Sequence, residues 1–313
     1  MDKHFLITGG AGFIGANLVR RLAGTGAPVR VLDNLSGGRA ADLAGLPVEL
    51  AIGDIRDEHL VRQVMTGIDI VIHLAAHTEV VRSIENPELN HEINVKGTLN
   101  LLQASVRQGV ERFIFASTGG AILGDVEPPA HEDMVPHPIS PYGASKLAAE
   151  GYCSAFWGSY GLKTVALRFS NVYGPYSYHK GSVIAIFCRN IRQGRELIIF
   201  GDGDQTRDFV YVEDLCQAIL AAAQRDLPFG EAIQLGTGTE ISINQLTDNI
   251  KAVVGPNHFP PVRYAPPRAG EVRRNYVSIA RAQQYLGFAP QTKLEEGLRR
   301  TWAWFQQQSQ PTE

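Results

Sequence analysis

The stretch Thr8-Gly9-Gly10-Ala11-Gly12-Phe13-Ile14-Gly15 decides the fold. It follows the apolar run 5–8 and opens a helical pattern over 13–23, which is the context that a dinucleotide-binding turn requires. Glycine permits the tight turn, lets the backbone approach a pyrophosphate and lets the helix pack closely on the strand. The start of the helix then offers free N–H groups and a positive dipole end to phosphates. A plain strand–turn–helix without a ligand is the alternative.

Short apolar runs alternate with helical patterns through the first half of the chain. We expect strands at 5–8, 29–33, 48–52, 70–73, 113–116 and 164–167, and helices at 13–23, 57–65, 88–108 and 141–158. Buried strands separated by helices indicate a parallel sheet with right-handed crossovers. The predicted fold is therefore α/β, a doubly wound parallel sheet of the Rossmann type with a smaller C-terminal substrate-binding region.

The character of the sequence changes after Asn171. Tyrosine, glycine and proline gather at 173–178, 201–203 and 256–267, and the helical patterns between them are shorter. We expect a dinucleotide-binding domain at 1–170. Residues 171–313 would form mainly the substrate domain, with some segments returning to the first domain.

Composition excludes several classes of protein. The chain has 313 residues, 44% hydrophobic and 19% charged, with a net charge of -3, so no basic excess indicates a nucleic-acid partner. No apolar run reaches the ~18 residues of a membrane span, and the first residues do not resemble a signal peptide, so a cytoplasmic location is expected. Cys153, Cys188 and Cys216 are widely spaced, which argues against a disulfide framework and against a metal site.

Carboxylates and small residues follow the next predicted strands. Asp33 ends the second strand, 18 positions after Gly15, near the spacing of about 20 for the carboxylate that binds an adenine ribose. It would repel a 2′-phosphate, which favours NAD over NADP, although Asp33-Asn34 is also turn chemistry. Asp54 ends the third strand and Leu74-Ala75-Ala76 follows the fourth. Small residues there allow a flat cofactor to approach, but close helix packing explains them equally well.

Tyr142 and Lys146 are four residues apart, so a helix places them on one face. Ser140-Pro141 supplies a cap and a helix-starting proline. A tyrosine pKa of about 10 is too high for a base at neutral pH, but a nearby ammonium and a cationic nicotinamide would lower it. The pair then predicts a base that accepts a hydroxyl proton during hydride transfer. Taken alone, Tyr-x-x-x-Lys also occurs by chance in many helices.

A hydroxyl pair ends the fifth predicted strand, in Ala116-Ser117-Thr118-Gly119-Gly120. Open α/β sheets bind ligands at the carboxyl ends of their strands. Ser117 or Thr118 could therefore share the substrate proton with Tyr142. The alternative is a hydroxyl that bonds its own turn.

The ordered combination of these motifs resembles the extended short-chain dehydrogenase/reductase family, and within it the NAD-dependent epimerase/dehydratase group, especially the UDP-glucose and UDP-N-acetylglucosamine 4-epimerases. The segment 168–175 is similar to the family's Arg-x-x-Asn-x-Tyr-Gly-Pro. The segment 201–214 is similar to its Gly-Asp-Gly…Arg-Asp-Phe, and 268–272 to its Arg-x-Gly-Asp. The resemblance covers nearly the whole chain.

The resemblance implies roles for individual residues. Tyr142 would be the base, Lys146 its partner, and Thr118 or Ser117 the hydroxyl helper. The residues implied to hold NAD are Gly9, Gly12, Phe13, Ile14, Gly15, Asp33, Asn34, Ser36, Gly37, Asp54, Ile55, Leu74, Ala75, Ala76, Asn94, Tyr142, Lys146 and Phe169. Those implied to bind a UDP-sugar are Thr118, Asn171, Ile199, Phe200, Arg207, Arg268 and Glu271. Arginine suits phosphate oxygens, although a surface ion pair is the alternative for each arginine singly.

Within the resemblance, the residues after Thr118 favour one reaction. The 4,6-dehydratases resemble Thr-Asp-Glu there, and decarboxylases carry a glutamate shortly after the hydroxyl, whereas Gly119–Leu123 has no acid. We therefore expect NAD-dependent 4-epimerisation of a UDP-hexose through a transient 4-keto sugar, and room for the sugar to turn above Gly119-Gly120. A dehydratase, a decarboxylase and a non-catalytic NAD-binding protein are the alternatives.

The resemblance also implies a homodimer, formed by two long helices from each subunit. The helices at 88–108 and 141–158 are the candidates, although packing on the sheet explains their apolar residues equally well. The sequence leaves open which sugar is used, and whether the base is uracil or thymine.

Overall fold

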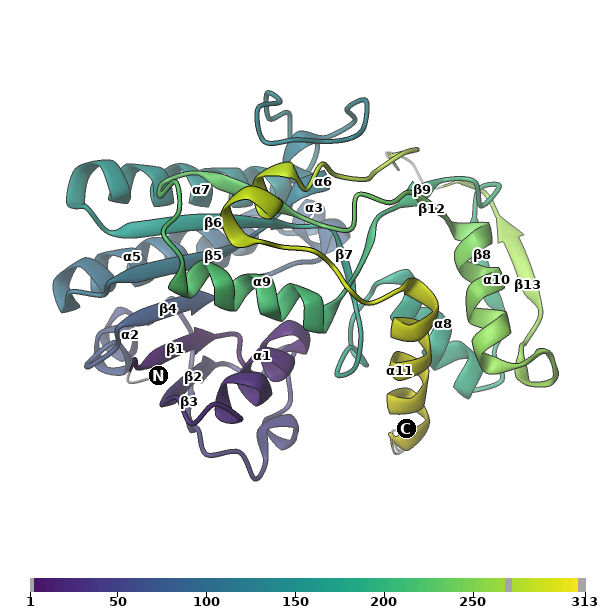
Figure 1. Cartoon of the computed structure of the whole chain (residues 1–313), viewed down its shortest axis with the longest axis horizontal. Coiled ribbons are helices and arrows are strands. Elements are labelled where there is room, and N and C mark those ends of the chain that lie inside the picture. The colour runs from purple at the N-terminus through teal and green to yellow at the C-terminus, as the bar shows by residue number, and fades with distance from the viewer. Residues whose placement is uncertain (1–2, 268–271, 309–313) are drawn as a thin grey trace.

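Seven parallel strands form the central sheet of the computed structural model, which describes residues 3–267 and 272–308 (Figure 1). Their order is β11-β6-β5-β4-β1-β2-β3. The predicted Rossmann-type fold is confirmed, and β11 is an edge strand that the sequence did not predict. The strands are β1 (Phe5–Thr8), β2 (Val29–Asp33), β3 (Glu49–Ile52), β4 (Ile70–His73), β5 (Arg112–Thr118), β6 (Lys163–Phe169) and β11 (Ala232–Leu235).

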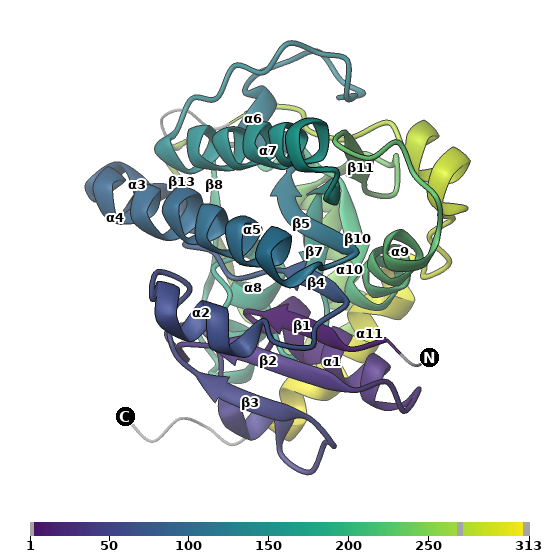
Figure 2. The same ribbon diagram turned by 90° about the vertical axis from the view of Figure 1, so that its left-hand side faces the viewer.

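Helices cover both faces of this sheet, as the crossover connections require (Figure 2). One face packs on α1 (Phe13–Ala23) and α9 (Val212–Gln224). The other packs on α2 (Glu58–Val64), α5 (Gly97–Gln108) and α7 (Pro141–Tyr160). Every residue of β1 and β4 is buried, which explains why these strands are continuous apolar runs without alternation.

The predicted helix at 88–108 is interrupted. The chain forms α4 (Pro87–His91), then a π-helical turn at Glu92–Lys96, and only then α5. The π turn directs the Asn94 side chain inward, where it bonds to the backbone of His77. Periodicity alone cannot reveal such an insertion, because the turns on either side remain helical.

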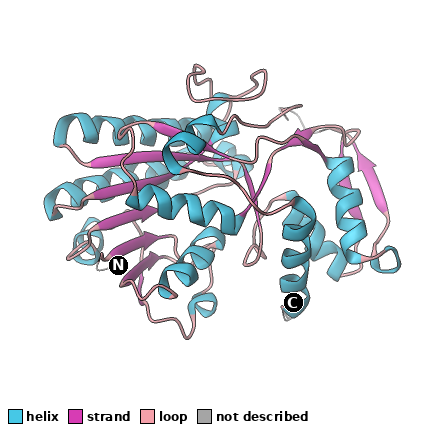
Figure 3. Ribbon diagram, in the orientation of Figure 1, coloured by secondary structure: helices cyan, strands magenta, loops and turns pink. Residues whose placement is uncertain are grey.

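The chain beyond β6 builds a second body at the carboxyl ends of the strands (Figure 3). It holds three two-stranded sheets: β7 (Asn171–Tyr173) with β10 (Phe209–Tyr211), β9 (Thr206–Arg207) with β12 (Ile241–Ser242), and β8 (Leu197–Phe200) with β13 (Val262–Ala265). Its helices α8 (Val183–Arg192), α10 (Ile243–Val254) and α11 (Leu294–Gln307) enclose a separate apolar core. Two short helices, α3 (Val80–Glu85) and α6 (Gly119–Leu123), follow β4 and β5. Among the described residues, no helix is long and apolar enough to cross a membrane.

Candidate functional site

The glycine turn between β1 and α1 leaves no room for side chains. A Cβ added to Gly15 would lie 2.2 Å from the carbonyl oxygen of Gly9, and one added to Gly9 would lie 2.7 Å from the backbone nitrogen of Ala75. Gly12 caps the helix without a side-chain hydrogen bond. The first N–H groups of α1 therefore face the strand ends without a capping side chain, and this arrangement fits a diphosphate.

Asp33 lies at the end of β2 and closes this turn. Its Oδ2 accepts a hydrogen bond from the backbone N–H of Ala11 at 2.9 Å, and its Oδ1 accepts one from Leu35 at 2.8 Å. Asp33 therefore does stabilise the turn that follows β2, as the alternative interpretation of this residue expects. This role does not exclude a ribose, because each carboxylate oxygen keeps a further lone pair.

Asp54 stands beside the Asp33 turn. Its Oδ2 accepts hydrogen bonds from the Asn34 amide at 3.1 Å and from the Arg56 guanidinium at 2.9 Å, and the bond with Arg56 lowers the pKa of Asp54. Ser36 donates to Asn34 Oδ1 at 2.7 Å. The next residue, Ile55, is buried in the core, so its side chain is not available to a ligand.

A buried hydrogen-bond chain fixes the ends of β1 and β4 together. The Thr98 hydroxyl donates to the carbonyl of Asn94 at 2.6 Å, so it must accept from His73 Nε2, which lies 2.9 Å away. His73 Nδ1 is then bare and accepts from the Thr8 hydroxyl at 2.7 Å. Burial holds the pKa of His73 well below its usual value, which keeps the ring neutral. The Thr8 oxygen in turn accepts from the backbone of Ala75, at the predicted cofactor slot.

The side chain of Asn94 is engaged within the protein. Its amide donates to the carbonyl of His77 and to the Ser145 hydroxyl, each at 3.0 Å, and its Oδ1 accepts from the His77 backbone at 2.8 Å. Both amide hydrogens are thus used. A contact of this side chain with NAD can come only through Oδ1.

Tyr142 and Lys146 lie one turn apart in α7, which begins as predicted. The Ser140 hydroxyl caps it by accepting from the backbone of Gly143 at 3.2 Å. The Tyr142 side chain hydrogen-bonds with that of Thr118 at the end of β5. The structure therefore brings together the predicted base and one of the two predicted hydroxyls.

The protein's own groups do not make the Tyr142 phenol acidic. Burial raises the pKa of Tyr142 to about 12, and the hydrogen bond with Thr118 only opposes that rise. Burial also lowers the pKa of Lys146 to about 7. Lys146 Nζ donates to the carbonyl of Ala116 at 2.8 Å and lies 4.6 Å from the centre of the Phe115 ring. In the protein alone burial therefore dominates the pKa of Tyr142, and the expected acidifying effect of Lys146 is not seen.

Ser117 points away from Tyr142. Its hydroxyl donates to Glu150 Oε1 at 2.6 Å, in a buried site where Glu150 also pairs with Arg168. Successive side chains of a strand lie on opposite faces, so only one of Ser117 and Thr118 can face the site. The hydrogen bond between Thr118 and Tyr142 favours Thr118 as the hydroxyl helper, whereas the Ser117 hydroxyl is engaged by Glu150.

Two amide side chains pack against Gly119 and Gly120. A Cβ added to Gly119 would lie 2.5 Å from Gln234 Oε1, and one added to Gly120 would lie 2.3 Å from Asn275 Nδ2. A larger side chain at either position would have to displace one of these two amides, and the expected room for a turning sugar above the glycines stays a prediction.

Apart from Thr118, the described residues that were predicted to bind the substrate lie on the second body, but one of them, Ile199, is not accessible to a ligand. Ile199 is 1% exposed in the apolar core, because strand alternation turns it inward while Phe200 is half-buried. Arg207 Nη1 donates to the backbone oxygens of Thr206 at 2.7 Å and of Val272 at 3.0 Å. Asn171 begins β7. Phe169 pairs in register with Thr118, whereas Arg268 and Glu271 lie outside the described residues.

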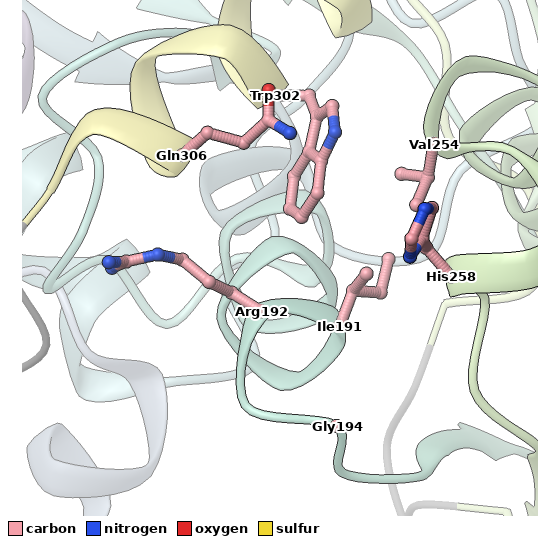
Figure 4. A pocket seen from close by; sticks show the side chains of 7 residues that line it. All are labelled: Ile191, Arg192, Gly194, Val254, His258, Trp302 and Gln306. Carbon is pink, nitrogen blue, oxygen red and sulfur yellow. The ribbon is translucent and has the colours of Figure 1, made fainter.

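A cavity of about 550 Å³ opens between α8, α10 and α11 (Figure 4). None of the predicted site residues that the structure describes lines it. Within residues 3–267 and 272–308, no group of three or more His, Cys, Asp or Glu side chains could hold a metal ion. The lining residues of the cavity are Ile191, Arg192, Gly194, Val254, His258, Trp302 and Gln306.

Sequence reasoning missed several residues around the site. Glu150 follows Lys146 by one helical turn, a spacing that could have marked it. Gln234 and Asn275 reach Gly119 and Gly120 from sequence positions more than 100 residues away, and no local pattern indicates them.

Comparisons with known proteins agree with this geometry. The model of the NAD dependent epimerase/dehydratase family matches residues 5–236. A relative from Methanocaldococcus jannaschii, named as a putative UDP-glucose 4-epimerase, is 40% identical over 96% of this chain and 97% of its own length. A dTDP-glucose 4,6-dehydratase from Streptomyces niveus is 34% identical over 96% of this chain and 92% of its own. The crystal structure of a Thermotoga maritima UDP-glucose 4-epimerase with UDP-glucose has a TM-score of 0.92 at 40% identity, and covers 97% of this chain and 98% of its own.

Proposed function

Because the chain belongs to the NAD-dependent epimerase/dehydratase family, we propose that it is an isomerase that epimerises a UDP-hexose at C4, with NAD as cofactor. The relatives include both epimerases and dehydratases, so family membership does not decide the reaction. The choice rests on the residues around the reacting hydroxyl.

The seat of the cofactor is the glycine turn and the strand ends beside it. Gly9, Gly12 and Gly15 let the backbone approach the diphosphate, and Asp33 receives the adenine ribose. When bound there, NAD would supply hydride-transfer chemistry, and the positive charge of its oxidised nicotinamide would favour the phenolate of Tyr142. The residues that complete the seat are Phe13, Ile14, Asn34, Ser36, Gly37, Asp54, Ile55 through its backbone, Leu74, Ala75, Ala76, Asn94, Lys146 and Phe169.

Tyr142 accepts the proton of the sugar hydroxyl. Its burial keeps the phenol protonated in the protein alone, so the proton leaves only once positive charge has gathered around the ring. Thr118 donates to the same oxygen and favours the phenolate. Lys146 sits one turn away and supplies a cation at the base of the site.

The single observation that favours an epimerase over a dehydratase is that the segment after Thr118, Gly119–Leu123, carries no carboxyl. Removing water from the sugar needs acid and base carboxyls near the hydroxyl. Here the two positions after Thr118 are glycines against which Gln234 and Asn275 are packed. The 4-keto sugar therefore keeps its substituents and takes the hydride back on its other face.

The second body holds the rest of the substrate. Arginine neutralises a diphosphate best through its planar fork, and Arg207 and Arg268 are the candidates. Asn171, Phe200 and Glu271 complete the proposed contacts with the diphosphate, base and ribose. In this division residues 1–170 bind the cofactor and 171–313 mainly the sugar nucleotide, while β11 and α9 return to the central sheet.

We also propose a homodimer. The apolar side chains of Val81 and Ile84 on α3 are 67% and 61% exposed, and α3 packs beside α7. Exposed apolar patches on folded chains commonly mark interfaces. Sedimentation of the protein and of an Ile84→Glu variant tests this, because a dimer that uses this face should dissociate in the variant. The cytoplasmic location stays a prediction.

The experiment that tests the function is a product assay over a panel of UDP-sugars and dTDP-glucose. A 4-epimer formed without loss of water or CO₂ supports the proposal. A stable 4-keto-6-deoxy product would contradict it. The panel should include UDP-glucose, UDP-N-acetylglucosamine and UDP-glucuronic acid.

A further inference from the structure

Polar side chains form a buried row across the edge of the central sheet. Ser117 on β5 pairs in register with Arg168 on β6, and Arg168 pairs with Gln234 on β11. Glu150 reaches down from α7 onto this row. Its Oε1 accepts from the Ser117 hydroxyl at 2.6 Å and from Arg168 Nε at 3.0 Å, and its Oε2 accepts from Arg168 Nη2 at 2.7 Å.

The Glu150 carboxylate accepts one hydrogen bond from a hydroxyl and charge-assisted hydrogen bonds from two nitrogens of a guanidinium. Glu150 is 9% exposed and Arg168 4%. The free energy needed to remove the two charges from water offsets most of the Coulombic attraction between them. A gain in stability is therefore a weak explanation for this buried ion pair. The position of Glu150 on α7 suggests a different role for this pair.

Glu150 follows Lys146 by four residues and Tyr142 by eight, so the three side chains lie on one face of α7. The groups that act on Lys146 come from several elements. Lys180 adds a second positive charge, and the thiol of Cys153 is kept neutral because burial raises its pKa.

The ring of His73, on β4, is neutral and already bonded at both nitrogens. Among these described groups, Glu150 is the anion.

We propose that Glu150 is a positioning residue that keeps Lys146 charged as an ammonium beside the Tyr142 phenol, and that Ser117 and Arg168 hold the Glu150 carboxylate in place for this purpose. The inference rests on the proposed function of the same site. It assigns to Ser117 and Arg168 a part in the reaction that acts only through Glu150.

Electrostatics support the direction of the effect. Burial lowers the pKa of Lys146 to about 7, and Glu150 is the first of the groups that raise it. Without that carboxylate Lys146 loses its proton at lower pH. The phenolate of Tyr142 then loses a neighbouring cation in the pH range where the enzyme should work.

The test compares wild-type holoenzyme with Glu150→Gln, Glu150→Asp and a double variant, Glu150→Gln with Arg168→Met. The measurement is kcat from about pH 6 to about pH 10, together with the absorbance of Tyr142 phenolate, taken as the difference from Tyr142→Phe. Asp214→Asn is the matched control. Asp214 is a similarly buried carboxylate on α9, across the sheet from α7.

We expect the alkaline limb of the Glu150→Gln profile to move down by about one pH unit, which is roughly a tenfold loss of kcat on that limb and much less near pH 6. Tyr142 should ionise at higher pH in this variant. The double variant should show the same shift of the alkaline limb, and it leaves no unpaired guanidinium charge because Arg168 is replaced as well. Glu150→Asp keeps the carboxylate and should retain most of the wild-type profile. Asp214→Asn should keep the wild-type limb.

An unshifted alkaline limb in folded Glu150→Gln or in the double variant would overturn the proposal while leaving the proposed function intact. Loss of folding in every Glu150 variant would also overturn it, because the role would then be structural. A wild-type protein that epimerises none of the sugars would instead contradict the proposed function. The phenolate titration would still report on Glu150 in that case.

Discussion

The proposed cofactor side and the proposed substrate side of the molecule are built by different means. At the ends of β1 and β4 the backbone itself makes the site, and Gly15 and Gly9 approach neighbouring backbone within distances that exclude a Cβ. On the substrate side, exposed ion pairs hold residues 273–274 against the segments that lead into β9 and β12. Arg273 pairs with Asp202, and Arg274 pairs with Glu240.

The difference matches what each side has to do. A cofactor that is regenerated in every turnover can stay bound, and tight backbone packing suits it because salt does not weaken it. A product must leave, and ion pairs in water contribute little each and are screened by salt. Substitutions on the cofactor side should therefore cause large changes in NAD affinity or kcat that do not depend on salt. Substitutions on the substrate side should cause small changes in KM that fade as the salt concentration rises.

The largest effect should come from Tyr142→Phe, which removes the proposed base but keeps the ring. We expect kcat to fall by about 10² to 10⁴, the usual contribution of a general base. NAD binding, measured by calorimetry, should stay close to wild type because the backbone seat is untouched. Unchanged turnover would remove Tyr142 from the mechanism.

Gly15→Ala should have the next largest effect. Its Cβ would lie 2.2 Å from the Gly9 carbonyl oxygen, so either the turn or α1 must shift. Strain of this kind costs about 1–3 kcal/mol, which corresponds to about ten- to hundredfold weaker NAD binding.

The control for that substitution is Gly24→Ala at the other end of α1. Gly24 has a right-handed helical backbone, and the nearest atom to its added Cβ lies 3.5 Å away. If both variants bound NAD equally well, the backbone seat would not be the basis of cofactor binding.

Thr118→Val should lower kcat by about tenfold, since it removes one hydrogen bond to the Tyr142 oxygen and keeps the shape. Ser117→Ala should cost less, because its hydroxyl serves Glu150 and not the sugar. The two variants are compared by kcat at saturating substrate. A larger loss in Ser117→Ala would reverse the assignment of the two hydroxyls.

The smallest effect should come from Arg274→Gln on the substrate side. We expect KM to rise by about two- to fivefold at low salt, with the difference fading at about 0.5 M NaCl because the pairs of Arg274 are exposed. The Arg274 hydrogen bond lowers the pKa of Glu240 to about 2. The pair is therefore complete above the ordinary glutamate pKa and is lost as the pH falls toward 2. If the change in KM of Arg274→Gln did not depend on salt, the expected difference between the cofactor side and the substrate side would be contradicted.

The elements of the proposed cofactor side could be predicted from the sequence because their signals are local. The glycine turn, the strand-end Asp33 and the pair Tyr142 and Lys146 each lie within one element or one turn, and the strands of the first half were predicted within a few residues. The π turn at Asn94 was missed, since it preserves helical periodicity on both sides.

The substrate side could be predicted only in part. Asn275 and Gln234 meet the turn after β5 through long-range packing, which no spacing in the sequence reveals. Ile199 was predicted as a contact from an apolar run, but a run of four apolar residues does not show which of them a strand turns inward.

The edge strand β11 affects how the protein is made. It pairs with β6 only after the chain has passed through β7 to β10 and α9, so a nascent chain exposes the edge of β6 while those residues are still being synthesised. Open strand edges of this kind are where chains aggregate. A truncation before residue 232 should therefore be insoluble, even though it contains every residue proposed for the cofactor seat.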